Sequence, residues 1–312
     1  MLSSARLRFF VASLVLCATA HAGTPASGTV YIGAAFGTHQ LYRVDFDYDG
    51  VGAMTLTTSI LATLPTVVDA FIVPGGDVVV AGQGSNVYKV NTATGTFETR
   101  STSNNGNTIS LDPAGTSVWI GWSDASPSQV PLDPFDNGTP HSVSGDDSTI
   151  TMLAFTPSNG VFYSNGGEGA AASVGTIDMP SFVTTRLYTG VPATSIVYDR
   201  YSRSLIFDAL GKATQVDPAD PMVTLSSRDD SALGENYLEL RPDGRGHLFG
   251  TRWGGGGGNP SGGRLVLIDY SATGLIGDAS TIIVSAPMVD GLSGGVAVDT
   301  SLLFNGFELP VR

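Results

Sequence analysis

Cysteine, lysine and long apolar runs are almost absent from this sequence of 312 residues. The only cysteine is Cys17, so the chain forms no internal disulfide and no cysteine-based metal site. Stability must therefore come from packing and hydrogen bonds, for which a chain of this length is large enough. After residue 22, no apolar run approaches the ~20 residues that span a bilayer, which predicts a protein without a membrane span.

Positive charge is scarce as well. The chain has 15 Lys and Arg residues, of which only Lys89 and Lys212 are lysines, against 28 Asp and Glu residues, and its net charge is −13. This negative field repels phosphate backbones and anionic lipids, so we expect neither nucleic acid nor a membrane surface as a partner. The expected ligand is a small molecule or another protein, bound by a monomer.

The N-terminus has the pattern of an export signal. Arg6 and Arg8 precede an apolar run over residues 9–18, and Ala20-His21-Ala22 supplies the small side chains that a signal peptidase needs. We therefore predict cleavage after Ala22 and a periplasmic or extracellular protein. Cleavage leaves 13 basic against 28 acidic residues, a net charge of −15.

A lipid anchor on Cys17 is the alternative to simple cleavage. It is disfavoured because Leu16 stands where a lipidated cysteine normally has a small residue before it. The predicted organisation is a signal peptide over residues 1–22, one domain over residues 23–302, and a short tail or edge strand over residues 303–312.

Glycine is abundant, with 40 residues, and short runs of Val, Ile, Tyr, Phe and Thr are separated by turn residues. This pattern predicts an all-β protein. One recurring feature is an apolar strand that ends in a Pro, Gly or Asp turn and is followed by a second strand. Its six copies cover residues 70–76, 109–115, 153–160, 196–200, 237–244 and 295–299.

A second recurring feature is a strand that ends in Asp or Asn, whose side chain would close an Asx-turn. Units of ~45 residues with this content match the four-stranded blade of a propeller, so the repeats predict six blades. The chain begins with a second strand (residues 29–33) and ends with a first strand (residues 295–299), so we expect these to pair and close the ring. The Asx-turn residues are Asp45, Asn91, Asp133, Asp178, Asp217 and Asp269.

The blade pattern resembles that of the NHL, YVTN and gluconolactonase-like propellers. It combines an apolar strand, a Pro-x-Gly turn, an aromatic-aliphatic strand, and a sequence such as Val90-Asn91-Thr92-Ala93-Thr94-Gly95. In gluconolactonase-like propellers, Glu, Asn and Asp side chains at the channel mouth hold a catalytic divalent cation. Virginiamycin-lyase-like propellers use a catalytic His, for which His247 is the candidate here. A structural role is the favoured interpretation of His39, His141 and His247, because none has a second histidine or a cysteine three or four residues away.

Polar residues stand just before each predicted innermost strand, where a propeller has its channel mouth. Such an oxygen-rich ring suits a hard cation that polarises a lactone carbonyl or activates water. The alternative, which we favour, is that these side chains satisfy backbone groups at strand ends. The candidates are Asp69, Asn107, Asp147, Glu235, Asn236 and Asp290.

A weaker candidate for a metal site is the segment Asp45-Phe46-Asp47-Tyr48-Asp49-Gly50. The spacing of Asp45, Asp47 and Asp49 suggests a tight loop that binds Ca²⁺ or another divalent cation. However, Leu56 occupies the position of the bidentate Glu in an EF-hand, and Ala53 occupies the ninth position, so a plain acidic turn is the favoured interpretation.

Two function classes follow from these patterns. The favoured one is an exported, non-catalytic β-propeller that binds a ligand or a protein partner on one face of the ring. The alternative is a metal-dependent hydrolase of the lactonase type, or a lyase, with its site at the mouth of the central channel. The alternative requires at least three of the channel-mouth side chains to converge on one point.

Overall fold

Turns containing Gly or Asn fold the apolar strands of this chain back on one another into six β-sheets. In the turns that follow three of the inner strands, Gly115, Asn159 and Gly244 have φ angles of 68°, 64° and 74°, which these residue types adopt readily. The structure, a computed structural model, describes residues 23–34, 39–67, 69–73, 75–82, 84–106, 108–122, 125–166, 171–209, 211–230, 237–252, 263–288 and 294–299.

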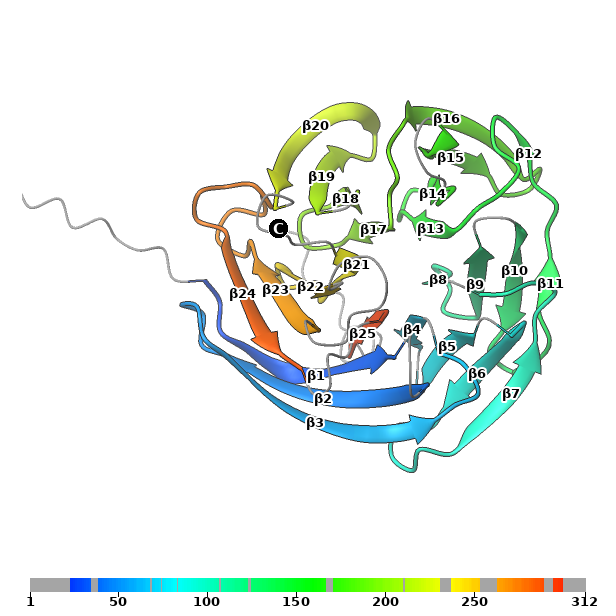
Figure 1. The fold of residues 1–312 in the computed structure, drawn as a ribbon. Helices are drawn as coiled ribbons and strands as arrows, with labels where there is room; N and C mark the ends of the chain where they lie inside the picture. The colour runs from blue at the N-terminus through cyan, green and yellow to red at the C-terminus, as the bar shows by residue number, and fades with distance from the viewer. Residues whose placement is uncertain are drawn as a thin grey trace, which may run out of the picture.

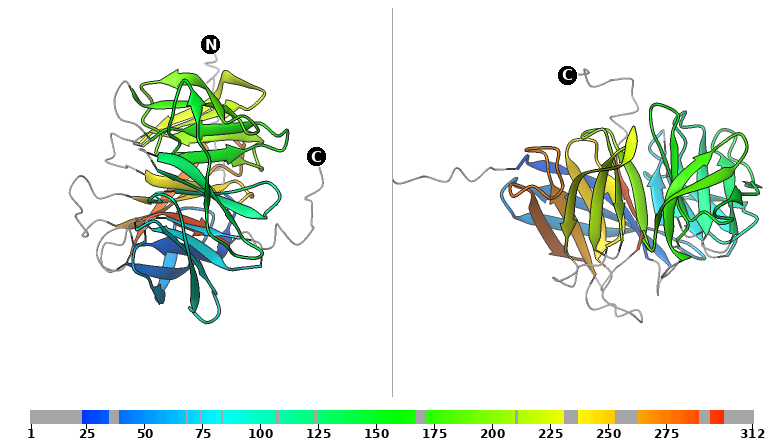
Figure 2. Two further views of the ribbon diagram at one scale, coloured as in Figure 1. Left: turned by 90° about the vertical axis from the view of Figure 1, so that its right-hand side faces the viewer. Right: turned by 90° about the horizontal axis from the view of Figure 1, so that it is seen from above.

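The six sheets form a ring, and Figure 1 shows this ring along its axis. The predicted six-bladed β-propeller is therefore confirmed. Figure 2 shows the strands crossing the thickness of the ring when it is seen from the side.

Each blade has an inner strand beside the central axis and three further strands towards the periphery. Blade 1 contains β25 (Val296–Val298), β1 (Ala26–Gly33), β2 (Gln40–Tyr48) and β3 (Met54–Thr63), and blade 2 contains β4 (Asp69–Ile72), β5 (Val78–Gly82), β6 (Asn86–Val90) and β7 (Phe97–Ser101). Blade 3 contains β8 (Thr108–Leu111), β9 (Ser117–Trp122), β10 (Ala125–Pro131) and β11 (Thr139–Pro140).

Blade 4 contains β13 (Met152–Phe155), β14 (Val161–Ser164), β15 (Ser173–Asp178) and β16 (Val183–Thr189), with the short strand β12 (Ser144–Gly145) added parallel to β16. This fifth strand is a departure from the predicted four. Blade 5 contains β17 (Ser195–Asp199), β18 (Ser204–Asp208), β19 (Lys212–Asp217) and β20 (Asp220–Asp229). Blade 6 contains β21 (Tyr237–Pro242), β22 (His247–Arg252), β23 (Arg264–Asp269) and β24 (Ile282–Pro287).

The ring is closed by strands from the two ends of the domain, as predicted. β1 pairs antiparallel with β25, with Val30 opposite Val298 and Ile32 opposite Val296. All four of these side chains are buried, and they belong to one apolar cluster with Phe249 of blade 6. Closure therefore satisfies the edge of β1 and buries apolar surface between the first and last blades.

The predicted Asx-turns form in several blades. A side-chain oxygen of Asn91 accepts a hydrogen bond from the N–H of Ala93, and Asp217 and Asp269 accept the N–H groups of the residues two positions after them. Blade 1 differs from the prediction, because β2 continues past Asp45 to Tyr48.

Apolar clusters lie between neighbouring blades. Trp119 of β9 packs with Leu153, Val161 and Tyr163 of blade 4, so it lies in the packing between blades 3 and 4. No helix in the part of the chain described here is long and apolar enough to cross a membrane.

Candidate functional site

The inner strands are held together by side chains that cap the backbone of the next blade. Each inner strand is an edge strand, and its unpaired N–H groups need acceptors. Side chains on the preceding inner strand supply them. Asp69 Oδ2 accepts the N–H of Ile109 (2.7 Å), Ser110 Oγ that of Leu153 (3.2 Å), Met152 Sδ that of Ile196 (3.3 Å), Ser195 Oγ that of Leu240 (3.1 Å) and Glu239 that of Val296.

Asp69 caps two of these strands. In blade 1, the residue before the capped Val296 is Gly295, and a Cβ there would lie 2.1 Å from Asp69 Oδ1. The next inner strand is β4, and Gly295 has no side chain that could cap it. Asp69 caps β4 instead, because its Oδ1 accepts the N–H of Ala70 on the same strand at 2.7 Å. The requirement for glycine at position 295 therefore follows from the close approach of this carboxylate.

Arg241 of β21 reaches across the inner strands to Asp69. Its Nη2 donates to Asp69 Oδ2 (3.1 Å) and to the carbonyl oxygen of Ile109 on β8 (2.6 Å), and it forms an ion pair with Glu239. Its guanidinium carbon lies 4.6 Å from the centre of the Phe71 ring. Arg241, Asp69 and Glu239, here called the Arg241 cluster, link blades 6, 2 and 3.

The Arg241 cluster is almost completely removed from water. The exposed fractions of the three side chains are 5% for Arg241, 4% for Glu239 and 1% for Asp69. Burial raises the pKa of Glu239 well above its ordinary value, the Arg241 charge opposes that shift, and the Asp69 carboxylate adds to it. A proton on Glu239 would leave one carboxylate for one guanidinium, a neutral combination that burial favours.

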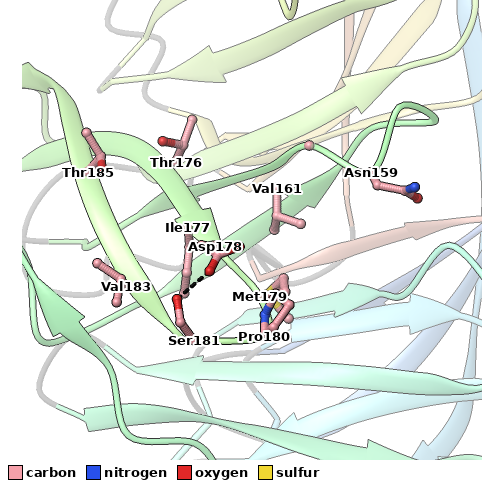
Figure 3. A pocket seen from close by; sticks show the side chains of 11 residues that line it. Asn159, Val161, Thr176, Ile177, Asp178, Met179, Pro180, Ser181, Val183 and Thr185 are labelled. Carbon is pink, nitrogen blue, oxygen red and sulfur yellow. Dashed lines mark hydrogen bonds between the residues drawn. The ribbon is translucent and has the colours of Figure 1, made fainter.

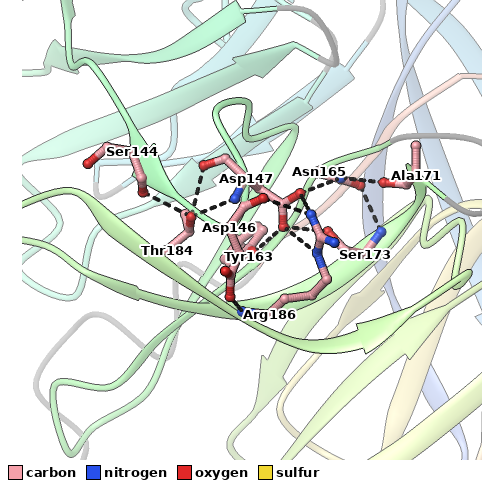
Figure 4. Close-up of polar contacts among 9 residues, drawn as sticks. All are labelled: Ser144, Asp146, Asp147, Tyr163, Asn165, Ala171, Ser173, Thr184 and Arg186. Atoms are coloured by element: carbon pink, nitrogen blue, oxygen red, sulfur yellow. Dashed lines mark hydrogen bonds and ion pairs between the residues drawn. The ribbon is translucent and has the colours of Figure 1, made fainter.

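Asp147 lies in a separate polar network within blade 4, shown in Figure 4. Its carboxylate accepts hydrogen bonds from Arg186 Nη2 (2.6 Å), Ser173 Oγ (2.7 Å), Asn165 Nδ2 (3.2 Å) and the Tyr163 hydroxyl. Burial would raise the pKa of Asp147, but the hydrogen bonds from Arg186, Tyr163 and Ser173 outweigh it and lower that pKa. Burial, and after it the same carboxylate, raises the pKa of Tyr163.

The predicted channel-mouth residues have different locations. Asp69 belongs to the Arg241 cluster, whereas the side-chain partners of Asp147 come from β14, β15, β16 and the β14–β15 connection. Among the described contacts, none joins the two carboxylates. The remaining candidates, Asn107, Glu235, Asn236 and Asp290, lie outside the described residues, as do the predicted signal peptide and tail.

The expectation of one tight acidic loop over residues 45–50 is wrong. Asp45 and Asp47 lie in the extended strand β2, where residues two apart are ~6.8 Å from each other. Asp45 instead accepts hydrogen bonds from Thr29 Oγ1 (2.6 Å) and Arg43 Nε (3.0 Å). Only Asp49 lies in a turn, and its Oδ1 accepts the N–H groups of residues 51, 52 and 53. Within the described ranges, no group of three or more His, Asp or Glu side chains is arranged to hold a metal ion.

The side chain of His247 is buried and bonded on both sides to protein groups, as in a structural role. His247 begins β22, is 1% exposed, and its Nδ1 lies 2.7 Å from Asp243 Oδ2. Its Nε2 lies 3.0 Å from the carbonyl oxygen of Thr24. Burial would lower the pKa of His247, but the Asp243 carboxylate outweighs it and holds that pKa above its ordinary value.

Sequence reasoning missed Glu239 and Arg241. The available signal was a pair of charged residues at alternate positions of a predicted innermost strand, Tyr237-Leu238-Glu239-Leu240-Arg241. Alternate residues of a strand share a face, and two opposite charges on one face of a buried strand indicate an ion pair.

A groove of about 710 Å³ lies at one end of blade 4 and is shown in Figure 3. It is lined by residues of β14, β15 and β16 and by turn residues, among them Asn159, Met179 and Ser181. The Ser181 hydroxyl donates to Asp178. None of its lining residues belongs to the Arg241 cluster or to the Asp147 network. It is therefore not part of the capped inner strands.

Comparison with known proteins finds a likeness in fold alone. No model of a protein family and no curated protein matches its sequence. Solved structures do match its fold, which confirms the predicted likeness to propellers of the gluconolactonase-like group at the level of the fold.

Three of these structures illustrate the likeness. Regucalcin, described as a calcium-binding protein, from Agrobacterium tumefaciens is 13% identical, with 72% of this chain and 76% of that chain covered and a TM-score of 0.50. A TolB structure from the same organism is 12% identical, with 84% and 89% covered and a TM-score of 0.52. The extracellular domain of a one-component system from B. thetaiotaomicron is 15% identical with a TM-score of 0.51, and the match covers 84% of this chain but only 34% of that chain.

Proposed function

We propose that this protein is an exported, non-catalytic β-propeller that binds a ligand or a protein partner on one face of its ring. The observation that carries the proposal is the engagement of the two described channel-mouth carboxylates. Asp69 is bonded to Ala70, Ile109 and Arg241, and Asp147 to an arginine and three further donors. Each carboxylate is held by its own set of protein donors, and among the described contacts the two do not converge on one point, as the metal-dependent enzyme would require.

Export is supported by the N-terminal pattern of residues 1–22 and by the acidic composition of the chain. A fold shared with an extracellular domain is consistent with that location. The same acidic composition favours a small-molecule or protein ligand over nucleic acid or a lipid surface.

The metal-dependent hydrolase or lyase would have to take its ligands from Asn107, Glu235, Asn236 and Asp290. No observation on the described residues favours it, and regucalcin, at 13% identity, shares only the fold. We keep it as an outcome of the experiment that tests the proposed function.

The first experiment is a thermal melt of the chain from residue 23 onwards, with EDTA and then with Ca²⁺, Mg²⁺, Mn²⁺ or Zn²⁺ added back. An ion present at 100 times its dissociation constant adds ~2.7 kcal/mol of stability, which shifts the midpoint by a few degrees. The binding propeller predicts no shift and no hydrolysis of lactones. A shift lost in Asp290→Ala or Glu235→Gln, together with hydrolysis of a lactone that the same variants lose, would support the metal-dependent enzyme. A shift lost only in Asp47→Ala would indicate a cation bound at β2.

The second experiment presents one face of the ring at a time. Because the chain after residue 22 has no cysteine, one introduced cysteine gives a single point of attachment to a support. Asn105→Cys and Ala114→Cys lie at exposed positions beyond opposite ends of β8, so they attach opposite faces. Binding on one face predicts capture of a ligand from host culture fluid with one variant and not the other. Equal capture with both, or with neither, would contradict the proposal.

A further inference from the structure

The segment that leads into β1 is bound in a polar pocket of blade 6. The N–H of Thr24 donates to Asp269 Oδ2 at 3.0 Å and to Ser271 Oγ at 3.2 Å, and the Thr24 carbonyl oxygen lies 3.0 Å from His247 Nε2. Both backbone polar groups of Thr24 are therefore satisfied by another blade, as they would be in a peptide-binding site.

Gly23 fits this pocket only because it has no side chain. A Cβ on Gly23 would lie 1.7 Å from Asp269 Oδ2 and 3.1 Å from the Tyr48 hydroxyl. Since a backbone nitrogen and the Cβ on the same α-carbon are about 2.5 Å apart, the Gly23 nitrogen lies within about 4.2 Å of that oxygen. From blade 1, Gly50 covers the segment, and a Cβ on Gly50 would lie 2.9 Å from the Gly23 carbonyl oxygen.

The charges of the pocket favour a cation. Asp269 is 2% exposed and accepts hydrogen bonds from Tyr48 (3.0 Å) and from the N–H and hydroxyl of Ser271 (3.0 and 2.6 Å). Asp243 is the second carboxylate, and His247 lies between the two, 2.7 Å from Asp243 and 3.8 Å from Asp269. Two carboxylates with one histidine leave a negative balance, and a buried carboxylate is best stabilised by a paired positive charge.

We propose that this pocket binds the α-ammonium group of Gly23 that is released when the chain is cleaved after Ala22. A signal peptidase adds water across the Ala22–Gly23 amide bond, so the carboxylate leaves on Ala22 and the amine on Gly23 takes a proton. The ammonium then forms an ion pair with Asp269. The inference rests on the export that the proposed function includes, and it goes beyond that function by linking processing to the stability of the ring.

The position of the pocket explains what the ion pair would do. His247 and Asp269 belong to blade 6, whereas Tyr48 and Gly50 belong to blade 1, the blade in which β1 and β25 close the ring. Fastening residue 23 at this place ties the closing blade to its neighbour. The processed chain is therefore expected to be more stable than any form whose residue 23 carries no charge.

The test compares three forms of the otherwise identical chain: one with a free amine on Gly23, one with that amine acetylated, and one that begins at Ala22. The free-amine form is expected to melt a few degrees higher than the other two at neutral pH. Asp269→Asn should remove this difference. Asp217→Asn is the matched control, because Asp217 closes the equivalent turn of blade 5 by accepting the N–H of Ala219, and it should leave the difference unchanged.

A second measurement needs no comparison of stabilities. An amine that is paired with Asp269 should react several-fold more slowly with an acetylating reagent than the same amine in Asp269→Asn, with Lys89 and Lys212 as internal references. Equal melting of the three forms together with equal reactivity would overturn the proposal. Sequencing of the exported chain that finds a first residue other than Gly23 would also overturn it, while leaving the ligand-binding function to the face-attachment experiment.

Discussion

Replacement of Arg241 by methionine tests whether the Arg241 cluster holds the inner strands together. Methionine retains a flexible apolar side chain that can stay packed on Phe71, but it removes the charge and the donor to the Ile109 carbonyl. Asp69 and Glu239 would then be two buried carboxylates without a cation.

The expected magnitude follows from this burial. Breaking a buried ion pair by removing one partner costs about 3–5 kcal/mol. In domains slightly smaller than this one, a loss of 1 kcal/mol lowers the melting temperature by roughly 2–4 °C. The melting temperature of Arg241→Met should therefore fall by about 10 °C. Because burial raises the pKa of Glu239, acidification protonates it more readily, and the cost of Arg241→Met should shrink as the pH falls.

The assay is urea unfolding at neutral and at mildly acidic pH, with Arg43→Met as the control. Arg43 is also bound to a carboxylate, Asp45, at 3.0 Å, but both side chains are nearly half exposed. Such surface pairs contribute about 0–1 kcal/mol, so the control should be almost neutral. If Arg241→Met were as mild as Arg43→Met at neutral pH, the structural role assigned to the cluster would be refuted.

Three further carboxyl and imidazole groups give pH-dependent stabilities of defined sign. Burial raises the pKa of Asp208 from 3.8 to about 7, so the folded chain loses stability as the pH rises through that value. In urea unfolding at about pH 8, Asp208→Asn should therefore be up to about 4 kcal/mol more stable than the parent. At about pH 4 this gain should be absent. Because the pKa of His247 is raised in the folded chain, protonated His247 stabilises the fold at a pH below the ordinary histidine pKa, and this stabilisation is lost as the pH rises. In thermal melts, His247→Gln should therefore be more destabilising at about pH 5 than at about pH 8. Hydrogen bonds from Ala53 and Val51 lower the pKa of Asp49, so Asp49→Ala should lower the melting temperature at neutral pH and lose its effect in acid, whereas Asp49→Asn should be milder.

The repeated strands and turns could be predicted because they depend on local chemistry. Turns can use residues such as Gly115 and Asn159 because these residue types tolerate positive φ angles, and Asx-turns at Asn91 and Asp217 need only the next few residues. The same local reasoning failed at Asp45, because pairing with β1 and β3 extends β2 to Tyr48. The fifth strand of blade 4 was also missed, since two residues leave no periodic pattern to detect.

The candidate site was less predictable. Asp69 and Asp147 were identified as polar residues before inner strands, but their partners Arg241 and Arg186 are 172 and 39 residues away in the chain. No spacing rule relates such residues, because each pair is brought together by the packing of strands. Whether Asn107, Glu235, Asn236 and Asp290 share a site stays a prediction, which the melts with divalent cations test.

The sequence by itself determined the number of blades, the place where the ring closes, and the acidic character of the chain, because repeats, turns and charge are properties of short segments. Only the tertiary structure decided which carboxylates are paired. The partners of Asp69, Glu239 and Asp269 are buried with them, and they come from blades that are far apart in the sequence. For that reason the pocket that holds Gly23 became visible only after the first and last blades were placed side by side.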